Sequence, residues 1–188
     1  AFCVALSHWL TRLFDLPLES VLPTATRMED RFHGRSSGMD VSVCYLGEPI
    51  RFLMGQGARP LSEIKKFPRF TFHDTGLRRS TKECVQKVEE FWQSNRERAV
   101  ELDRQMNQAS ERLVSALTLF QSSGTENATL NTLVEISEAM KQAHRCFEGW
   151  GLVTPEIQKI QENLMHEGAL AVRLTGAGRG GFLVALWP

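Results

Sequence analysis

A long stretch of helical patterning fills most of the second half of this 188-residue chain and limits the folds that it can form. From Ser80 onward, apolar residues recur every three or four positions, a spacing that places them along one side of a helix. The first series is Val85, Val88, Trp92, Ala99, Leu102 and Met106. Two further series predict helices over 109–120 and 130–147. This region therefore predicts a long buried stripe followed by further helices.

Local signals mark where several helices begin. Ser80 and Glu83 have the spacing of a capping box, in which each side chain satisfies a free backbone amide of the first turn. Thr154 followed by Pro155 predicts the start of a last helix, because proline loses no hydrogen bond at the first helical position. Two earlier helices are predicted over 1–14 and 24–32. The first is expected to bury the face that carries Phe2, Ala5, Leu6, Trp9, Leu10 and Leu13.

Strands are predicted on both sides of the helical region, at 39–45, 50–54, 69–73, 169–175 and 182–187. The first two are expected to form a hairpin through a turn at 46–49, and the last two flank a glycine loop. Helices segregated from strands in this way predict an α+β fold. A cluster of Gly, Pro and Lys over 55–68 predicts a boundary, which divides the chain into domains 1–58 and 59–188.

Composition excludes several classes of protein. Lys plus Arg and Asp plus Glu both number 22, which gives no electrostatic footprint for nucleic acid or for an acidic membrane surface. The four scattered cysteines make no C-x-x-C pair, so the chain predicts neither a zinc site nor a disulfide scaffold. Reduced thiols in a cytoplasm are the expected state. The chain starts inside a helical pattern without a methionine, which indicates that the natural protein extends upstream.

A glycine-flanked turn precedes the first candidate catalytic residue. Gly34 and Gly38 permit a tight backbone, and Asp40 follows at the head of a predicted strand, where its carboxylate is well placed to face a ligand. The same residue is also explained as a turn aspartate that bonds its own backbone. Spacing alone does not decide between these two interpretations.

A basic cluster lies at the start of the predicted helix after Ser80. Arg78, Arg79 and Lys82 add full positive charges to the partial charge of a helix N-terminus, which attracts anions. A solvated basic helix start has the same appearance in a sequence. The cluster is therefore a candidate for binding a small anionic ligand.

The glycine loop near the end of the chain runs over 173–181. Its letters also fit a dinucleotide-binding fingerprint, but that motif requires a following helix, and a strand is predicted here instead. A glycine hairpin without any ligand is an equally simple explanation. His144 is similarly ambiguous, because it lies toward the apolar side of its helix, where a core histidine is the usual explanation.

Three motifs together resemble the mevalonate kinases of the GHMP kinase superfamily. The first is G-x-x-S-G-x-D, matched by Gly34, Ser37, Gly38 and Asp40. The second is a threonine before a basic residue at a helix start, matched by Thr81 and Lys82. The third is [KR]-x-T-G-A-G-x-G-G, matched by Arg173, Thr175, Gly176, Ala177, Gly178, Gly180 and Gly181. Their order is that of the family, and the resemblance extends over nearly the whole chain.

The resemblance implies a role for each matched residue. Asp40 would accept the proton of the substrate hydroxyl, and Glu29 would hold Mg²⁺. Four residues would line the substrate, namely Arg78, Arg79, Thr81 and His144. The residues expected near the nucleotide and its phosphates are Ser37, Gly38, Thr175, Gly176, Ala177, Gly178 and Gly180.

Three positions depart from the family pattern. Ser36 and Arg78 each replace a proline, which makes the paths of their loops less certain. Arg179 stands where a glycine is usual in mevalonate kinases. Its side chain would either crowd the loop or add a cation near the transferred phosphate, and the sequence does not decide between these effects.

The implied reaction is ATP-dependent phosphorylation of the 5-hydroxyl of mevalonate, with Mg²⁺, in isoprenoid biosynthesis. The implied fold is the remainder of a ribosomal-protein-S5-like lobe followed by a ferredoxin-like lobe with a helical hairpin. Ala1 corresponds to the last alanine of the family's phosphate loop, so the chain alone is expected to be inactive. A homodimer is an open expectation. Phosphomevalonate kinase, another GHMP small-molecule kinase and a non-catalytic homologue or interaction module remain alternatives.

Overall fold

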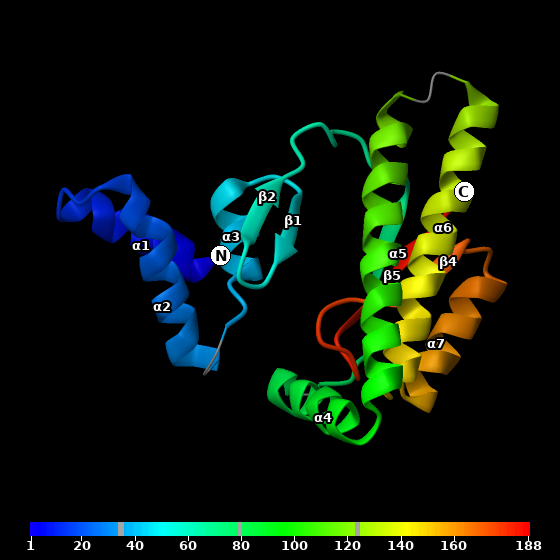
Figure 1. The fold of residues 1–188 in the computed structure, drawn as a ribbon. Coiled ribbons are helices and arrows are strands. Elements are labelled where there is room, and N and C mark those ends of the chain that lie inside the picture. Colours follow the sequence, from blue (N-terminus) through cyan, green and yellow to red (C-terminus); the bar gives the residue numbers. More distant parts are fainter. Residues whose placement is uncertain (34–35, 79, 123–124) are drawn as a thin grey trace. The chain divides into compact units, whose positions relative to one another are not determined.

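The computed structural model describes residues 1–33, 36–78, 80–122 and 125–188, without the side chains of residues 32 and 33. Contacts divide the chain into two compact units, Ala1–Ile64 and Lys65–Pro188 (Figure 1). This division falls a few residues beyond the boundary expected at 58/59. Each unit has a core drawn from its own residues.

The first unit contains helices and one small hairpin. Its elements are α1 (Phe2–Leu13), η1 (Leu18–Ser20), α2 (Val21–His33), α3 (Met39–Leu46), β1 (Ile50–Leu53) and β2 (Gly57–Pro60). The core joins Cys3 and Val4 of α1 to Ala25 of α2 and Val41 of α3. Small side chains at these contacts let the helices approach closely.

Helix α1 forms where the sequence predicts it, but the prediction of its buried face is wrong. Cys3, Val4, Ser7 and Thr11 are buried, whereas the larger side chains of Phe2, Trp9 and Leu13 are more than half exposed. Polar contacts explain how the small face packs, because the Ser7 hydroxyl donates to the Met28 sulfur of α2. Within the first unit, the face of α1 that carries small side chains therefore packs in the core, where the face with the large apolar side chains was expected.

The segment 39–45 was expected to be a strand, and this prediction is wrong because it forms helix α3. Gly38, with a left-handed φ of 83°, precedes the helix, and Gly47, with a φ of 68°, ends it. The Ser42 hydroxyl donates to the carbonyl of Gly38, one turn back. The alternation of apolar residues that suggested a strand is thus overridden by these end signals. Strand β1 pairs with β2 instead, with Ile50 opposite Pro60.

The second unit combines a three-stranded antiparallel sheet with four helices in its described part. Its elements are β3 (Phe70–Asp74), α4 (Thr81–Ser94), α5 (Arg96–Ser122), α6 (Glu126–Gly149), α7 (Pro155–His166), β4 (Ala171–Leu174) and β5 (Phe182–Leu186). The strand order is β3-β5-β4. These strands, helix α6 and the start of α7 lie where the sequence predicts them.

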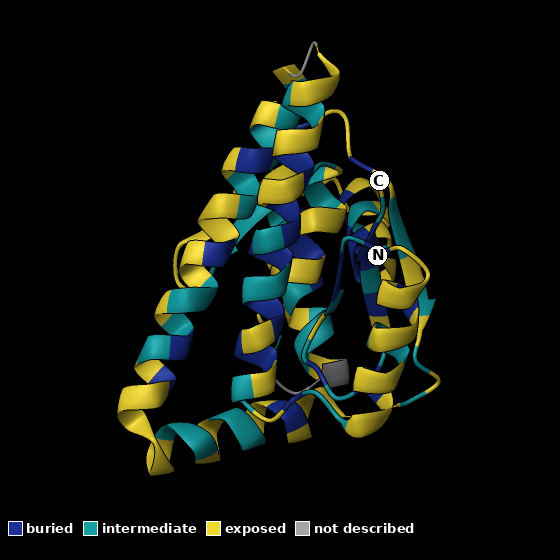
Figure 2. Ribbon diagram, turned by 90° about the vertical axis from the view of Figure 1, so that its right-hand side faces the viewer, coloured by how far each residue is buried: buried dark blue, intermediate teal, exposed yellow. Residues whose placement is uncertain are grey.

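The long helices pack on the sheet through their apolar sides. Helices α5 and α6 run side by side, and Figure 2 shows buried and exposed residues alternating along them, as amphipathic helices require. The Ser137 hydroxyl of α6 donates to the carbonyl of Leu170, just before β4, at 2.8 Å. Two consecutive residues of β4 belong to different core clusters, Ala171 to one and Val172 to the other. Since successive strand residues face opposite ways, both faces of the sheet take part in packing.

Two helix details differ from the sequence-based expectation. A break at Asn95, whose φ is −140°, separates α4 from α5, and α5 then continues unbroken past residues 106–109. The capping box at Ser80 is absent, since the Ser80 side chain makes no capping hydrogen bond. The cap of α7 is confirmed, because Thr154 Oγ1 accepts a hydrogen bond from the amide of Ile157.

In the described part of the chain, no helix combines the length and apolar character that crossing a bilayer requires.

Candidate functional site

The glycine loop of the second unit joins β4 to β5 and is closed at its base by threonine. Both the amide and the hydroxyl of Thr175 donate to the carbonyl of Phe182, at 2.9 and 2.8 Å. Within the loop, Gly176, Gly178 and Gly181 have left-handed φ values of 65°, 97° and 77°. A side chain would strain these positions, so the glycines of the motif are needed for the path of the loop.

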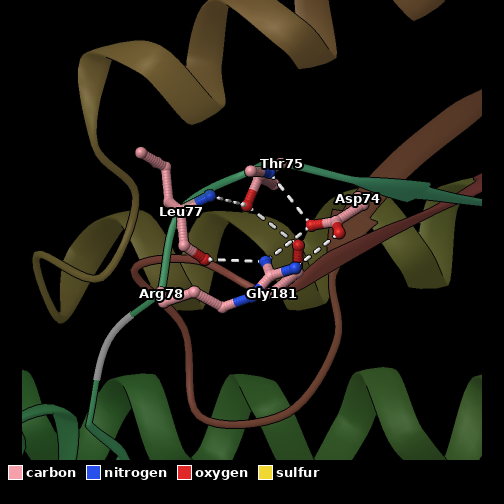
Figure 3. Close-up of polar contacts among 6 residues, drawn as sticks. Asp74, Thr75, Leu77, Arg78 and Gly181 are labelled. Atoms are coloured by element: carbon pink, nitrogen blue, oxygen red, sulfur yellow. Dashed lines mark hydrogen bonds and ion pairs between the residues drawn. The ribbon is translucent and has the colours of Figure 1, made fainter.

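Three segments hold this loop in place. The amide of Gly181 donates to the carbonyl of Leu77, while the Gly181 carbonyl accepts from the amide and hydroxyl of Thr75 (Figure 3). The amide of Arg179 donates to the carbonyl of Leu152 at 2.8 Å, in the connection between α6 and α7. The thiol of Cys84, on α4, donates to the carbonyl of Gly178. The loop is therefore fixed against the starts of α4 and α7.

Close packing gives a second reason for two of the glycines. A Cβ added at Gly178 would lie 2.8 Å from the Cβ of Leu152, and one added at Gly180 would lie 2.7 Å from the carbonyl oxygen of Leu77. The second contact is with backbone, which has little room to move. These two glycines are explained by the packing of the loop itself, independently of any ligand.

The basic cluster before α4 is partly neutralised within the chain. Both terminal nitrogens of Arg78 donate to the carboxylate of Asp74, at 2.7 and 2.6 Å, and Figure 3 shows the two side chains pointing toward each other. The Arg78 guanidinium lowers the pKa of Asp74 to about 2, helped by a hydrogen bond from the amide of Gly76. Arg78 is thus already paired with a carboxylate. Its role in substrate binding stays a prediction.

The other members of the cluster lie at the helix start. Arg79 is outside the described residues, and Thr81 is the exposed first residue of α4. Because Ser80 provides no side-chain cap, the first amides of α4 are not satisfied by it. Such amides attract an anion, and the place of Thr81 near the substrate stays a prediction.

In the first unit, Asp40 lies on the exposed first turn of α3. The turn before it is held by the hydroxyls of Ser36 and Ser37, which accept from the amides of Gly38 and Met39. Its partner Gly34 is outside the described residues. A carboxylate on the first turn of a helix is stabilised by the helix dipole and is open to an incoming hydroxyl.

Glu29 lies on α2 and is half-buried beside Cys3. Burial raises the pKa of the Cys3 thiol, and the hydrogen bond with Glu29 raises it further. Within the described residues, no three His, Cys, Asp or Glu side chains are grouped to hold a metal ion. Mg²⁺ bound through phosphates needs only one or two carboxylates, so a single ligand such as Glu29 is compatible with it.

His144 lies in the core of the second unit rather than at its surface. Its side chain is 3% exposed, and Nε2 lies 3.7 Å from the Glu148 carboxylate on the next turn of α6. Neither ring nitrogen makes a hydrogen bond of ordinary geometry with a described residue, although an interaction with the Gln161 side chain acts to raise the pKa of the ring. Burial lowers the pKa of His144, while Glu148 acts in the opposite direction. The position suits a core histidine, and contact with a substrate stays a prediction.

Three residues of the candidate site, namely Asp74, Cys84 and Leu152, were not singled out from the sequence. Asp74 and Arg78 are four residues apart, a spacing that would have predicted their ion pair. The Cys84 thiol and the Leu152 carbonyl left no comparable signal, because their contacts with the loop join residues far apart in the chain. Only the fold brings them together.

The comparisons with known proteins identify the class first. Residues 125–188 match the family model described as GHMP kinases C terminal, a region that contains α6, α7, β4, the glycine loop and β5. These residues therefore resemble the C-terminal domain of GHMP kinases. The predicted resemblance and the α+β fold class are confirmed.

Individual relatives are mevalonate kinases. The chain is 27% identical over 191 residues to the mevalonate kinase of Thermococcus sibiricus, covering 100% of this chain and 54% of the relative. It is 26% identical over 176 residues to a mevalonate kinase of Gibberella zeae, covering 91% and 34%. The crystal structure of L. major mevalonate kinase in complex with R-mevalonate matches with a TM-score of 0.67 and 26% identity, covering 97% and 54%. The chain thus spans between about one third and about half of these relatives.

Proposed function

We propose that this chain is part of an ATP-dependent kinase that phosphorylates the 5-hydroxyl of mevalonate. The observation that carries the proposal is the similarity to mevalonate kinases, in sequence and in fold, along almost all of the chain. The structure of one such relative is described as a complex with R-mevalonate. A cytoplasmic location and a homodimer are further parts of the proposal.

In this proposal Asp40 of the first unit acts on the substrate hydroxyl. Its carboxylate is exposed on the first turn of α3, behind a turn fixed by Ser36 and Ser37. A carboxylate held in this way can accept the hydroxyl proton as the new oxygen–phosphorus bond forms. Glu29 would contribute one oxygen ligand to the metal ion.

The second unit would bind anionic groups. The start of α4 has backbone amides that no side chain caps, Thr81 adds a hydroxyl, and the glycine loop is held against this helix by the Cys84 thiol. When bound, ATP with Mg²⁺ supplies the transferred phosphoryl group and the metal charge that neutralises it. Positioning by such fixed donors accounts for much of the rate enhancement in phosphoryl transfer.

The test is ADP release by the full-length gene product that contains these residues, with ATP, Mg²⁺ and R-mevalonate. We expect Asp40→Asn to lower kcat by about 10²- to 10⁴-fold while ATP binding stays unchanged. The matched control is Asp15→Asn, which removes an exposed carboxylate of the same unit and should leave kcat unchanged.

The same assay with 5-phosphomevalonate as acceptor separates the two related activities. Turnover of R-mevalonate but not of 5-phosphomevalonate supports the proposal. The opposite preference, or a normal kcat in Asp40→Asn, would contradict it.

A further inference from the structure

We propose that Arg179 is an anion-binding residue of the glycine loop, which contacts a phosphate group through its guanidinium. The inference rests on the proposed kinase function, and it deepens that function by adding a binding residue that the family motif lacks. The ligand chemistry is a phosphate dianion, carried by the nucleotide or by the phosphorylated product.

The backbone of Arg179 is held in a conformation that disfavours its side chain. Its φ is 56°, and Asp15 is the other non-glycine residue with a positive φ in the described part of the chain. Aspartate tolerates this region because its short side chain can bond locally, but arginine has no such compensation. A glycine at this position would avoid the strain, so the presence of arginine requires a separate reason.

The neighbouring contacts prevent the strain from relaxing. The amide of Arg179 donates to Leu152, and the carbonyl of the preceding Gly178 accepts from the Cys84 thiol. On the other side, Gly180 lies so close to the carbonyl of Leu77 that even a Cβ would collide with it. The backbone of Arg179 is thus held in place by the contacts of the glycines on either side of it. The position of its Cα and the direction in which its side chain leaves the backbone are therefore fixed.

The guanidinium has a buried donor without a partner. Arg179 is partly buried, and its Nε is inaccessible and makes no hydrogen bond to any described residue. Two other arginines of this unit have partners, since Arg112 pairs with Glu135 and Arg173 lies over the ring of Phe147. Among the described residues, no carboxylate forms an ion pair with Arg179. A buried charged donor left unpaired is costly, so each such group in a native protein calls for an explanation, and a bound ion is one of them.

The loop around Arg179 suits an oxyanion. The left-handed residues Gly178, Arg179 and Gly181 turn the backbone sharply, and the amides of Arg179 and Gly181 are already used on the carbonyls of Leu152 and Leu77. The donors that remain for an anion at this position are therefore those of the Arg179 guanidinium. A guanidinium adds two parallel donors that match the geometry of a phosphate. The strain and the unpaired donor are both explained if the bound state supplies the missing partner.

The first experiment measures thermal unfolding of the 188-residue chain with and without inorganic pyrophosphate, at an ionic strength matched with NaCl. We expect saturating pyrophosphate to raise the Tm of the unmodified chain by about 3–6 °C. Arg179→Gly should have an equal or higher Tm without the anion, because glycine removes both the strain and the unpaired donor, and should lose the shift. Arg179→Lys should keep part of the shift. Arg112→Gln, on the exposed surface of α5, serves as the control with a full shift.

The second experiment identifies the source of the phosphate in the full-length gene product. Calorimetric Kd values for MgADP and for 5-phosphomevalonate are compared between the unmodified enzyme and Arg179→Gly. We expect a loss of about 10- to 100-fold for one ligand, which names the group that Arg179 contacts.

Two outcomes would overturn the proposal. One is a pyrophosphate shift in Arg179→Gly equal to that of the unmodified chain. The other is a clearly lower Tm of Arg179→Gly without the anion, which would make Arg179 a structural residue of the loop. Neither readout uses mevalonate, so a failure of the proposed substrate would leave this test unaffected.

Discussion

At the scale of one residue, His144 shows how burial makes a histidine of the core sensitive to pH, while its contact with a substrate stays a prediction. Its ring is almost completely buried on α6, and burial lowers its pKa from the ordinary value of 6.5. Glu148, at 3.7 Å, and the side chain of Gln161 oppose this lowering of the pKa, and Arg173 adds to it from β4. The net effect on the pKa is downward, so folding favours the neutral form of this histidine.

The sign of the pH dependence follows from that direction. Below about pH 6.5 the unfolded chain binds a proton at His144 before the folded chain does. The contribution to stability is therefore complete above this pH and is lost as the pH falls. We expect the Tm to be lower at pH 5.5 than at pH 7.5. This decrease should be larger by a few degrees in the unmodified chain than in His144→Gln.

His166 provides the matched control for this measurement. It is exposed near the end of α7, so His166→Gln should keep the pH dependence of the unmodified chain. Circular dichroism melting curves at both pH values give the Tm of each variant. The quantity to compare is the change of Tm with pH, not the absolute Tm. An identical slope in His144→Gln would show that other groups control the acid sensitivity.

At the scale of elements, the sequence predicts those whose start signals and apolar period agree. Helix α7 is an example, because Thr154 and Pro155 mark its start and Ile157 and Leu164 form its buried side. Helix α3 fails for the opposite reason. Its alternating apolar residues have the period of a strand, while Gly38 and Gly47 at its ends permit a short helix. No short-range rule decides between these signals.

The candidate site follows the same division. The glycine loop was predicted from its letters, and the structure confirms strands on both sides of it. Its anchors were not predictable, because Leu77 and Leu152 contact it through backbone carbonyls, which any residue possesses. Sequence motifs therefore locate such a loop, while the contacts that fix it come from the fold.

The anchoring of the loop leads to a prediction about its glycines. Gly180→Ala places a Cβ against the backbone oxygen of Leu77, whereas Gly176→Ala meets nothing within 4 Å and has only the cost of its φ of 65°. We expect Gly176→Ala to lower the free energy of unfolding by about 1 kcal/mol, and Gly180→Ala by at least twice as much. Urea denaturation of both variants measures the difference. Equal losses would mean that the loop moves away from Leu77 without difficulty.

At the scale of the whole molecule, the two units differ in how they are stabilised. The second unit buries apolar residues from four helices and from strands β4 and β5, including Ile136, Ile157 and Leu183. The first unit has a small core built around Cys3, Val4, Ala25 and Val41. Buried apolar area is the main favourable term in folding, so the second unit is expected to be the more stable of the two.

Because every strand of the larger sheet and both of its core clusters come from Lys65–Pro188, this segment should fold without the rest of the chain. We expect a fragment of residues 65–188 to unfold cooperatively, with a Tm within a few degrees of the upper transition of the complete chain. The complete chain should show an additional, lower transition from the first unit. Trp9 is the one tryptophan of that unit, so its fluorescence, isolated by replacing the tryptophans at 92, 150 and 187 with phenylalanine, should report this transition. A fragment without cooperative unfolding, beside a complete chain that melts in one step, would show that the second unit depends on the first for its stability.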